Sequence, residues 1–291
     1  TGASNTAVGV NALDANTTAS NNTAVGNDAL YVNTTGSENT AIGKFSLQSN
    51  TTGSNNNALG YNALGANTTG TQNTAMGRDA LGSNTTGNHN TGVGYASLGA
   101  NTTGTQNTAV GRDSLLANTT GANNTALGYQ ALDANTTGAS NSALGRGAGG
   151  SYVSGYNNTS IGYLADGDGT SGNGNITIGY NAQKSAVGSA GQCTLGSSDI
   201  TNLRCNDTTI SSLSDSRDKT NIIDSPYGLD FINTVRPVQF KWESRDGNGK
   251  DGSTRIGFLA QELLAATDGN NAVLDLVMDD NPDKLEAKYG N

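Results

Sequence analysis

The residues of this chain that could carry out covalent chemistry lie in one short polar run, Ser211–Lys219. The run contains serine hydroxyls and one lysine amine, with Asp215 and Arg217 between them. A lysine that is withdrawn from water loses proton affinity and can then take the proton of a nearby hydroxyl. A serine and a lysine are therefore sufficient for attack on a carbonyl group. The alternative is that these side chains form only a solvated polar loop.

Other enzyme chemistries find little support. His89 is the single histidine, so a Ser-His-Asp or Cys-His site would need it as the base, and a histidine-rich metal site is impossible. A depolymerase acting on polysaccharide needs paired carboxylates in a groove. The aspartates of the first half are single and scattered, at Asp14, Asp28, Asp79, Asp113 and Asp133. We expect no metal, no cofactor and no action on other substrates.

Charge and hydropathy exclude two classes of partner. The net charge is −9, and nucleic acids and anionic membranes both need a concentrated basic surface, of which the sequence gives no sign. The apolar runs are much shorter than the roughly 20 residues that cross a bilayer. We therefore expect neither nucleic-acid binding nor membrane insertion. Because the chain begins with Thr1, we interpret it as part of a longer or processed polypeptide.

The composition indicates a narrow, repetitive fold. Asn, Thr and Gly supply 39, 37 and 41 of the 291 residues, whereas hydrophobic residues are 33% and charged residues 13%. That hydrophobic content can hardly fill one large core, and the charged content is too low for a typical disordered chain. A repeat fold therefore explains the composition better than one large globular domain or a disordered chain.

The repeat has a period of 17 residues and begins with Asn-Thr-Ala-aliphatic-Gly or a variant of it. Twelve coils follow one another without an insertion, starting at Asn5, Asn22, Asn39, Asn56, Asn73, Asn90, Asn107, Asn124, Asn141, Asn158, Asn175 and Gln192. The fourth position is apolar, and we expect its side chain to point inward: Val8, Val25, Ile42, Leu59, Met76, Val93, Val110, Leu127, Leu144, Ile161, Ile178 and Leu195. The fifth is always Gly, which allows a bend or a close backbone approach. A second apolar position, Leu13 through Leu132, marks the first eight coils.

Two short strands and two turns per coil predict a flattened β-solenoid whose coils stack about 4.8 Å apart. A coil with one or two large apolar side chains buries little surface alone. We therefore expect several chains, most simply three, to pack together as a trimeric β-roll fibre.

The early coils close with Asn-Thr-Thr-Gly, as at Asn67–Gly70, or with Asn-Thr-Thr-Ala in the first coil, and three interpretations are open. The triplet is an N-glycosylation acceptor, and threonine arrays on a flat face can bind ice. The interpretation we favour is a ladder of stacked polar side chains that satisfy one another at a turn.

The coils resemble the head repeats of trimeric autotransporter adhesins and related coils of phage tail fibres, whose rolls are left-handed and trimeric. The resemblance covers about residues 5–208, with a period longer than that of the usual adhesin coil.

The composition changes near residue 210. Residues 1–210 carry 16 charged side chains and residues 211–291 carry 23, together with all three prolines and the only tryptophan. We expect regular coils over 1–140, degenerate coils over 141–210 and a small α+β domain over 211–291. The elements expected in this domain are a helix at 228–235, a strand at 238–242, a glycine turn at 246–253 and a strand running into a helix at 256–266.

Ser214-Asp215-Ser-Arg217-Asp-Lys219 resembles the opening of the endosialidase-type intramolecular chaperone, the self-cleaving C-terminal domain of many phage tail fibres and tailspikes. Further matches follow in order at 228–237, 240–242 and 257–262, the last reading Gly-Phe-Leu-Ala-Gln-Glu. The family usually ends in a long helix, so we expect the domain to be C-terminally incomplete here.

This resemblance implies roles for individual residues. Ser214 would be the nucleophile, Lys219 its base, and the bond between Leu213 and Ser214 the cleavage site, with Asp215 and Arg217 in support. At most, the chain would be a single-turnover, self-cleaving serine peptidase.

The resemblances together predict the shaft of a phage tail fibre, located in the virion and extracellular after release. Its partners would be two further copies in a homotrimer, tail or baseplate proteins, and a host cell-surface receptor, with a glycan as one candidate. A bacterial trimeric surface adhesin is the alternative.

Overall fold

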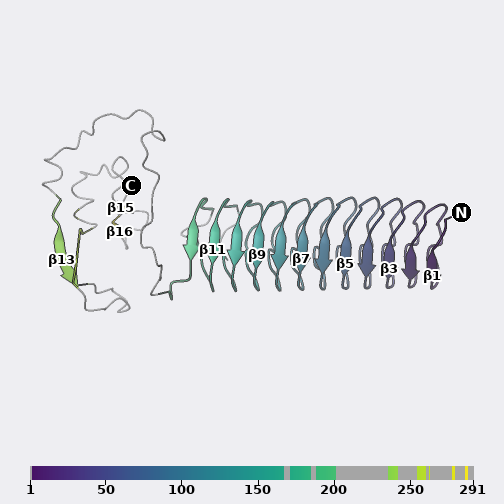
Figure 1. Ribbon diagram of the computed structural model, residues 1–291, viewed down its shortest axis with the longest axis horizontal. Coiled ribbons are helices and arrows are strands. Elements are labelled where there is room, and N and C mark those ends of the chain that lie inside the picture. Colours follow the sequence, from purple (N-terminus) through teal and green to yellow (C-terminus); the bar gives the residue numbers. More distant parts are fainter. Residues whose placement is uncertain are drawn as a thin grey trace, which may run out of the picture. The chain divides into compact units, whose positions relative to one another are not determined.

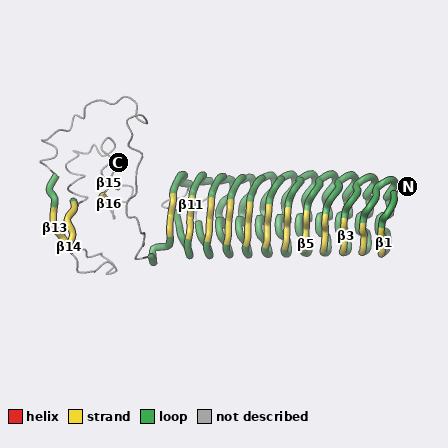
Figure 2. The backbone as a smooth tube through the Cα atoms, in the orientation of Figure 1, coloured by secondary structure: helices red, strands yellow, loops and turns green. Residues whose placement is uncertain are grey.

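The computed structural model describes residues 2–166, 171–184, 188–200, 235–241, 254–259, 262, 277–278 and 286–287. The chain divides into two compact units, Thr1–Ile200 and Thr201–Asn291. The first unit is a regular stack of coils (Figures 1 and 2). The expected helix at 228–235 and the helical part of 256–266 lie almost entirely outside the described residues.

Each of the 12 coils contributes one three-residue strand to a single parallel sheet, in chain order (Figure 1). The strands are β1 (Thr6–Val8), β2 (Thr23–Val25), β3 (Thr40–Ile42), β4 (Asn57–Leu59), β5 (Thr74–Met76), β6 (Thr91–Val93), β7 (Thr108–Val110), β8 (Thr125–Leu127), β9 (Ser142–Leu144), β10 (Thr159–Ile161), β11 (Ile176–Ile178) and β12 (Cys193–Leu195). Neighbouring strands pair in a register of 17, so that Thr108 faces Thr125. The β-solenoid prediction is confirmed.

The expected second strand of each coil is wrong for the described residues. The segment after the strand is a chain of turns in which three residues per coil have left-handed backbone angles, for example Asn62 (φ 55°), Leu64 (φ 52°) and Gln72 (φ 57°). The glycine after each strand is also required. Gly94 has φ 134°, and a Cβ there would lie 2.5 Å from the carbonyl oxygen of Gly111. Turns thus replace a second sheet because the coil must reverse direction within 17 residues.

The expected inward direction of the fourth-position side chains is also wrong. In β7, Ala109 is fully buried, whereas Val110 is 39% exposed on the other face of the strand. Successive side chains of a strand point to opposite faces, so a buried third position places the fourth outside. The interior of the coil is filled by this alanine and by the leucine of the turn. The buried leucines are Leu13, Leu30, Leu47, Leu64, Leu81, Leu98, Leu115 and Leu132.

Two buried asparagine columns connect successive coils. In the Asn-Thr-Thr-Gly column, Asn84 donates from Nδ2 to Asn67 Oδ1 (2.9 Å) and to the Gly87 carbonyl (3.0 Å). In the column at the coil start, the Asn90 backbone N–H donates to Asn73 Oδ1 (2.9 Å). These are the stacked polar ladders favoured by the sequence. Because Asn84 is fully buried and hydrogen-bonded, its amide is not exposed for glycosylation in the folded coil.

The interior changes character in the last coils. After Leu132 the leucine column stops, and the buried Tyr152 ring lies beside Gly149, where the next leucine would be. The Tyr152 hydroxyl is 3.1 Å from Ser160 Oγ, which is 3.1 Å from Thr177 Oγ1. Lys184 Nζ lies 4.9 Å from the centre of the Tyr152 ring. The last coils therefore bury a polar interior.

In the second unit, β13 (Val238–Lys241) pairs antiparallel with β14 (Thr254–Gly257), close to the two strands that the sequence predicts. A second antiparallel pair joins β15 (Val277–Met278) and β16 (Glu286–Ala287).

Candidate functional site

The residues predicted to cleave the chain lie outside the described part of the structure. These are Ser214, Lys219, Asp215 and Arg217, together with the Leu213–Ser214 bond. Their assignment as nucleophile, base, supporting pair and cleavage site remains a prediction from the sequence.

Part of the segment that resembles the chaperone is described. Arg236, just before β13, donates a hydrogen bond to the carboxylate of Glu262, which ends the Gly-Phe-Leu-Ala-Gln-Glu segment after β14. The Glu262 carboxylate raises the pKa of Arg236 above its usual value. Because Arg236 lies at the surface, this ion pair links two of the predicted motifs but contributes little stability.

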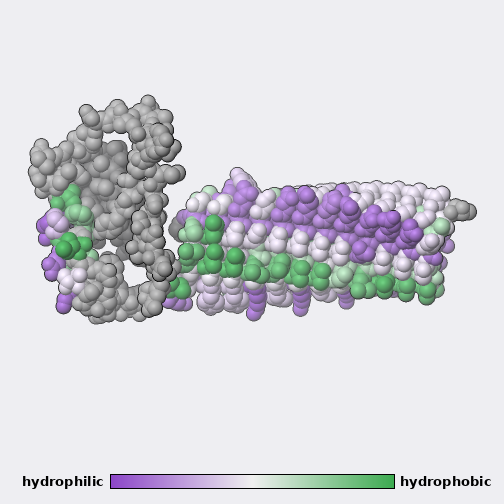
Figure 3. All heavy atoms as spheres, viewed as in Figure 1, coloured by the Kyte–Doolittle hydropathy of each residue, from purple (hydrophilic) through white to green (hydrophobic). Residues whose placement is uncertain are grey.

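The outer face of the 12-stranded sheet carries an uninterrupted apolar column, which we define as the fourth-position residues Val8 to Leu195. Ten of its 12 side chains are between 38 and 58% exposed: Val8, Ile42, Leu59, Met76, Val110, Leu127, Leu144, Ile161, Ile178 and Leu195. Figure 3 shows the corresponding hydrophobic band along the solenoid. Soluble monomers rarely expose a long contiguous apolar surface, so this face has the character of an interface.

A second column lies two residues after the apolar column in each coil, directly after the glycine that follows the strand. We call it the cation–tyrosine row, and its members are Lys44, Tyr61, Arg78, Tyr95, Arg112, Tyr129, Arg146 and Tyr163. The Arg112 guanidinium carbon lies 5.5 Å from the Tyr95 ring centre and 5.7 Å from that of Tyr129. Arg78 and Arg146 lie between tyrosine rings in the same way, at 5.3 to 5.8 Å. From Tyr61 to Tyr163 the alternation forms a continuous cation–π stack, whereas Lys44 lies over the ring of Phe45.

The structure aligns cations that lie far apart in the sequence. Residues 1–200 contain five lysines and arginines, of which four, Lys44, Arg78, Arg112 and Arg146, belong to this row. The fifth, Lys184, is buried. The four are spaced 34 residues apart, twice the coil period. A search at 34 residues would have found them, whereas a search at 17 mixes cations with tyrosines.

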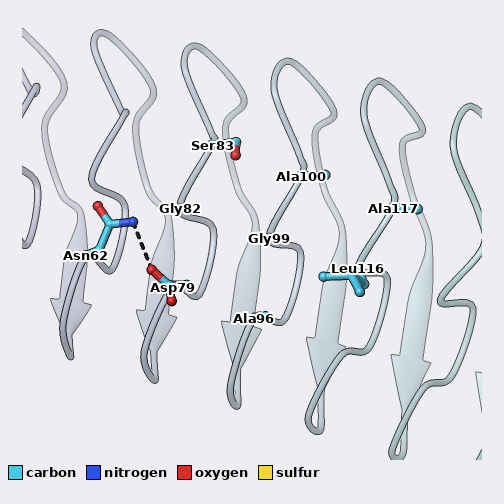
Figure 4. A pocket seen from close by; sticks show the side chains of 9 residues that line it. All are labelled: Asn62, Asp79, Gly82, Ser83, Ala96, Gly99, Ala100, Leu116 and Ala117. Atoms are coloured by element: carbon cyan, nitrogen blue, oxygen red, sulfur yellow. Dashed lines mark hydrogen bonds between the residues drawn. The ribbon is translucent and has the colours of Figure 1, made fainter.

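A shallow groove of about 460 Å³ lies beside the row and crosses several coils (Figure 4). Asp79, the residue after Arg78, lines it and accepts a hydrogen bond from Asn62 (2.9 Å). Small residues such as Gly82, Gly99 and Ala100 form its floor. The row therefore borders an open depression that is lined mainly by small and apolar residues, with Asn62, Asp79 and Ser83 as its polar side chains.

Among the residues that the structure describes, no three His, Cys, Asp or Glu side chains come together in a way that could hold a metal ion. Within the same residues, no helix has the length and hydropathy to span a membrane.

Comparison with known proteins identifies the C-terminal segment. Residues 214–274, about a fifth of the chain, match the family described as chaperone of endosialidase. Searches of curated proteins and of solved structures found no match. The match begins at Ser214, the predicted nucleophile, and spans the motifs that carried the resemblance. The chain therefore joins a β-solenoid of 17-residue coils to a C-terminal segment that matches the endosialidase chaperone family, a combination that fits a tail-fibre or adhesin-like fibre.

Proposed function

We propose that the protein is the shaft of a phage tail fibre that takes part in host attachment. In this proposal the C-terminal chaperone brings three chains together and then releases itself by cleavage between Leu213 and Ser214. The fibre is carried on the virion through tail or baseplate proteins.

The observation that carries the proposal is the exposed apolar column. Its side chains lie in a straight line on the outer face of the sheet, where a single chain leaves them in water. Packing the columns of three parallel chains around one axis would bury them along the whole length, at about 25 cal/mol for each Å² of apolar surface. The thin interior of each coil would thereby gain a second core shared between chains.

The chaperone supplies what the coils lack, which is a unique register. If one chain slipped by one coil, its Leu127 would face Val110 of the neighbouring chain and no longer the Leu127 of that chain. Almost every contact would be preserved. Identical faces specify register weakly, so a trimer-forming domain at one end removes the alternatives. Its release after assembly would leave the fibre kinetically trapped.

The cleavage step follows from the predicted dyad. Lys219 takes the hydroxyl proton of Ser214, and Ser214 Oγ attacks the carbonyl carbon of Leu213. The C–N bond breaks as the amine of Ser214 receives the proton, and water then hydrolyses the resulting ester.

The test combines sedimentation of the full chain with intact mass spectrometry. We expect a trimer and a fragment that ends at Leu213. Ser214→Ala should abolish that fragment and leave the trimer intact, whereas Ser216→Ala, a serine two residues away, should cleave normally. A folded monomer would refute the assembly, and an unchanged fragment pattern in Ser214→Ala would refute the assignment of the nucleophile.

A further inference from the structure

We propose that the cation–tyrosine row is a binding site for a linear acidic polysaccharide that carries one carboxylate for every two sugars. This inference rests on the proposed role in host attachment, to which it adds the site and the class of ligand.

The charge distribution singles out this row. The exposed basic side chains of residues 1–200 are Lys44, Arg78, Arg112 and Arg146, and all of them lie on it. The protein as a whole is acidic, with a net charge of −9. A single line of cations on an acidic surface attracts an anion along that line and repels it elsewhere.

The spacing of the cations sets the repeat of the ligand. Coils stack about 4.8 Å apart, so cations in every second coil are roughly 9.6 Å apart. That distance is close to the length of two sugar rings in an extended glycan. A nucleic-acid strand carries a phosphate about every 3.4 Å, which is much denser than the row. The periodicity therefore fits an acidic disaccharide repeat better than a phosphate backbone.

The arginine side chains of the row are preorganised for binding such a ligand. Arg78 and Arg112 use Nε to bind Asp79 and Asp113, at 3.1 and 3.0 Å, while their side chains remain 64 and 62% exposed. The flanking tyrosine rings hold each guanidinium in place, so its terminal N–H groups are ordered before a carboxylate arrives. Tyr61 and Tyr95 are each 45% exposed and contribute hydroxyls along the same line.

The chain offers no acidic column of its own that matches the row. In residues 1–200, the only acidic residues 34 positions apart are Asp79 and Asp113, and both already bind the arginines beside them. A second copy therefore offers no column of carboxylates with the spacing of the row, which argues for an external anion.

The groove beside the row gives the sugar rings room. Asp79 and Asn62 line it as hydrogen-bonding groups for sugar hydroxyls, and its glycine and alanine floor allows a ring to approach the backbone (Figure 4). The row would thus bind the carboxylates while the groove contacts the neutral sugar between them.

The test measures binding of the full chain to hyaluronan and unsulfated chondroitin, which carry one carboxylate per two sugars, with dextran as the neutral glycan. We expect binding to the two acidic glycans that weakens as salt increases, and none to dextran. The triple variant Arg78→Gln, Arg112→Gln, Arg146→Gln should bind at least tenfold more weakly. Lys44→Gln, at the end of the row, should weaken binding less.

A composition-matched variant separates spacing from charge. Tyr95→Arg with Arg112→Tyr keeps the net charge and the residue types but moves one cation by a coil, and it should also weaken binding. Thr86→Gln, on an exposed threonine outside the row, should bind as the wild type does.

Four outcomes would overturn the proposal: no binding to either acidic glycan, equal binding to dextran, full affinity in the triple variant, or tighter binding to poly(dT) than to hyaluronan. Sedimentation and the Leu213 fragment are measured on the same samples. A cleaved trimer that ignores acidic glycans would leave the fibre function standing and remove only the ligand.

Discussion

The early and late coils share one backbone but fill it differently. From β2 to β8 the interior is mainly a column of leucines and alanines, with a buried serine in three coils, Ser46, Ser97 and Ser114. In the coils of β9 to β11 it holds the Tyr152–Ser160–Thr177 hydrogen bonds and an ion pair between Lys184 and Asp166 (Nζ to Oδ1, 3.2 Å). The sheet register and the asparagine column at the coil start continue through both regions, for instance from Asn158 to Asn175. Backbone and asparagine hydrogen bonds therefore define the coil, and the interior side chains are free to vary.

The two interiors differ in how uniquely they position the chain. Consecutive leucines of the early coils are interchangeable, so each coil could stack on several others with the same contacts. Lys184 and Asp166 are both buried and carry opposite charges, and their ion pair is not repeated at the equivalent positions of the early coils. A specific polar contact can fix register at some cost in stability. The late coils are therefore the part of the solenoid that can define its own alignment.

The largest effect is expected from breaking that pair. Asp166→Ala leaves Lys184 as a buried, uncompensated charge and should lower the free energy of unfolding by about 3–5 kcal/mol. Replacing both partners, with Asp166→Leu and Lys184→Met, should restore most of this stability, since the apolar pair needs no compensation. Urea unfolding monitored by circular dichroism measures both. Equal losses in the two variants would mean that the pair acts through its shape and not through its charge.

The next largest effect is expected from removing a leucine of the early interior. Two leucines in neighbouring columns of the coil allow a comparison of a buried with an exposed position. Leu81 is fully buried, whereas Leu116 is 37% exposed. Leu81→Ala removes buried methyl groups and leaves a cavity, so we expect a loss of about 3 kcal/mol. Leu116→Ala should cost less than about 1 kcal/mol by the same urea titration. Similar losses at both positions would indicate that the groove side of the coil is covered in solution.

The smallest effect concerns the boundary between the two regions, where Asp133 follows Leu132. Burial, assisted by the nearby Asp113 carboxylate, raises the pKa of Asp133 above its ordinary value, although backbone hydrogen bonds offset part of the rise. A carboxyl group with a raised pKa in the folded state favours folding most below its unfolded pKa, and this contribution is lost as the pH rises through the folded value.

Asp133→Asn should therefore raise the melting temperature slightly at pH 7, and the difference from wild type should shrink toward pH 3. Asp14→Asn, at the equivalent position of the first coil, where the side chain is exposed, serves as the control for the substitution itself. A gain for Asp133→Asn that persists unchanged at pH 3 would contradict the assignment to this carboxyl.

The period, the glycine after the strand and the asparagine ladders could be predicted from the sequence, because a stacked coil repeats its contacts at every turn. The direction of Val110 could not be predicted from hydropathy alone. Its neighbour Ala109 is the buried residue, since the coil is too narrow for a larger side chain opposite Leu115. The Thr-Ala-Val alternation contained that signal, but the apolar character of valine outweighed it.

Of the candidate functional regions, the chaperone motifs could be predicted from the sequence and the cation–tyrosine row could not. The chaperone motifs were recognisable because they are a fixed series of residue types, and the family match covers them. The cation–tyrosine row was missed because Arg78 and Tyr95 occupy the same position of adjacent coils and look like random variation until the coils are stacked.

The one-strand coil also has a mechanical consequence. Strands run across the fibre, so the hydrogen bonds between coils lie along its axis and carry an axial load directly. A pull on one end would peel the coils away in sequence, because each coil is joined to the next by the same set of bonds. A released coil of 17 residues extends to roughly 58 Å in place of the rise of about 4.8 Å that it had in the stack. The solenoid is in this sense a reserve of length, able to lengthen in steps of roughly 50 Å under tension while the remaining coils stay folded.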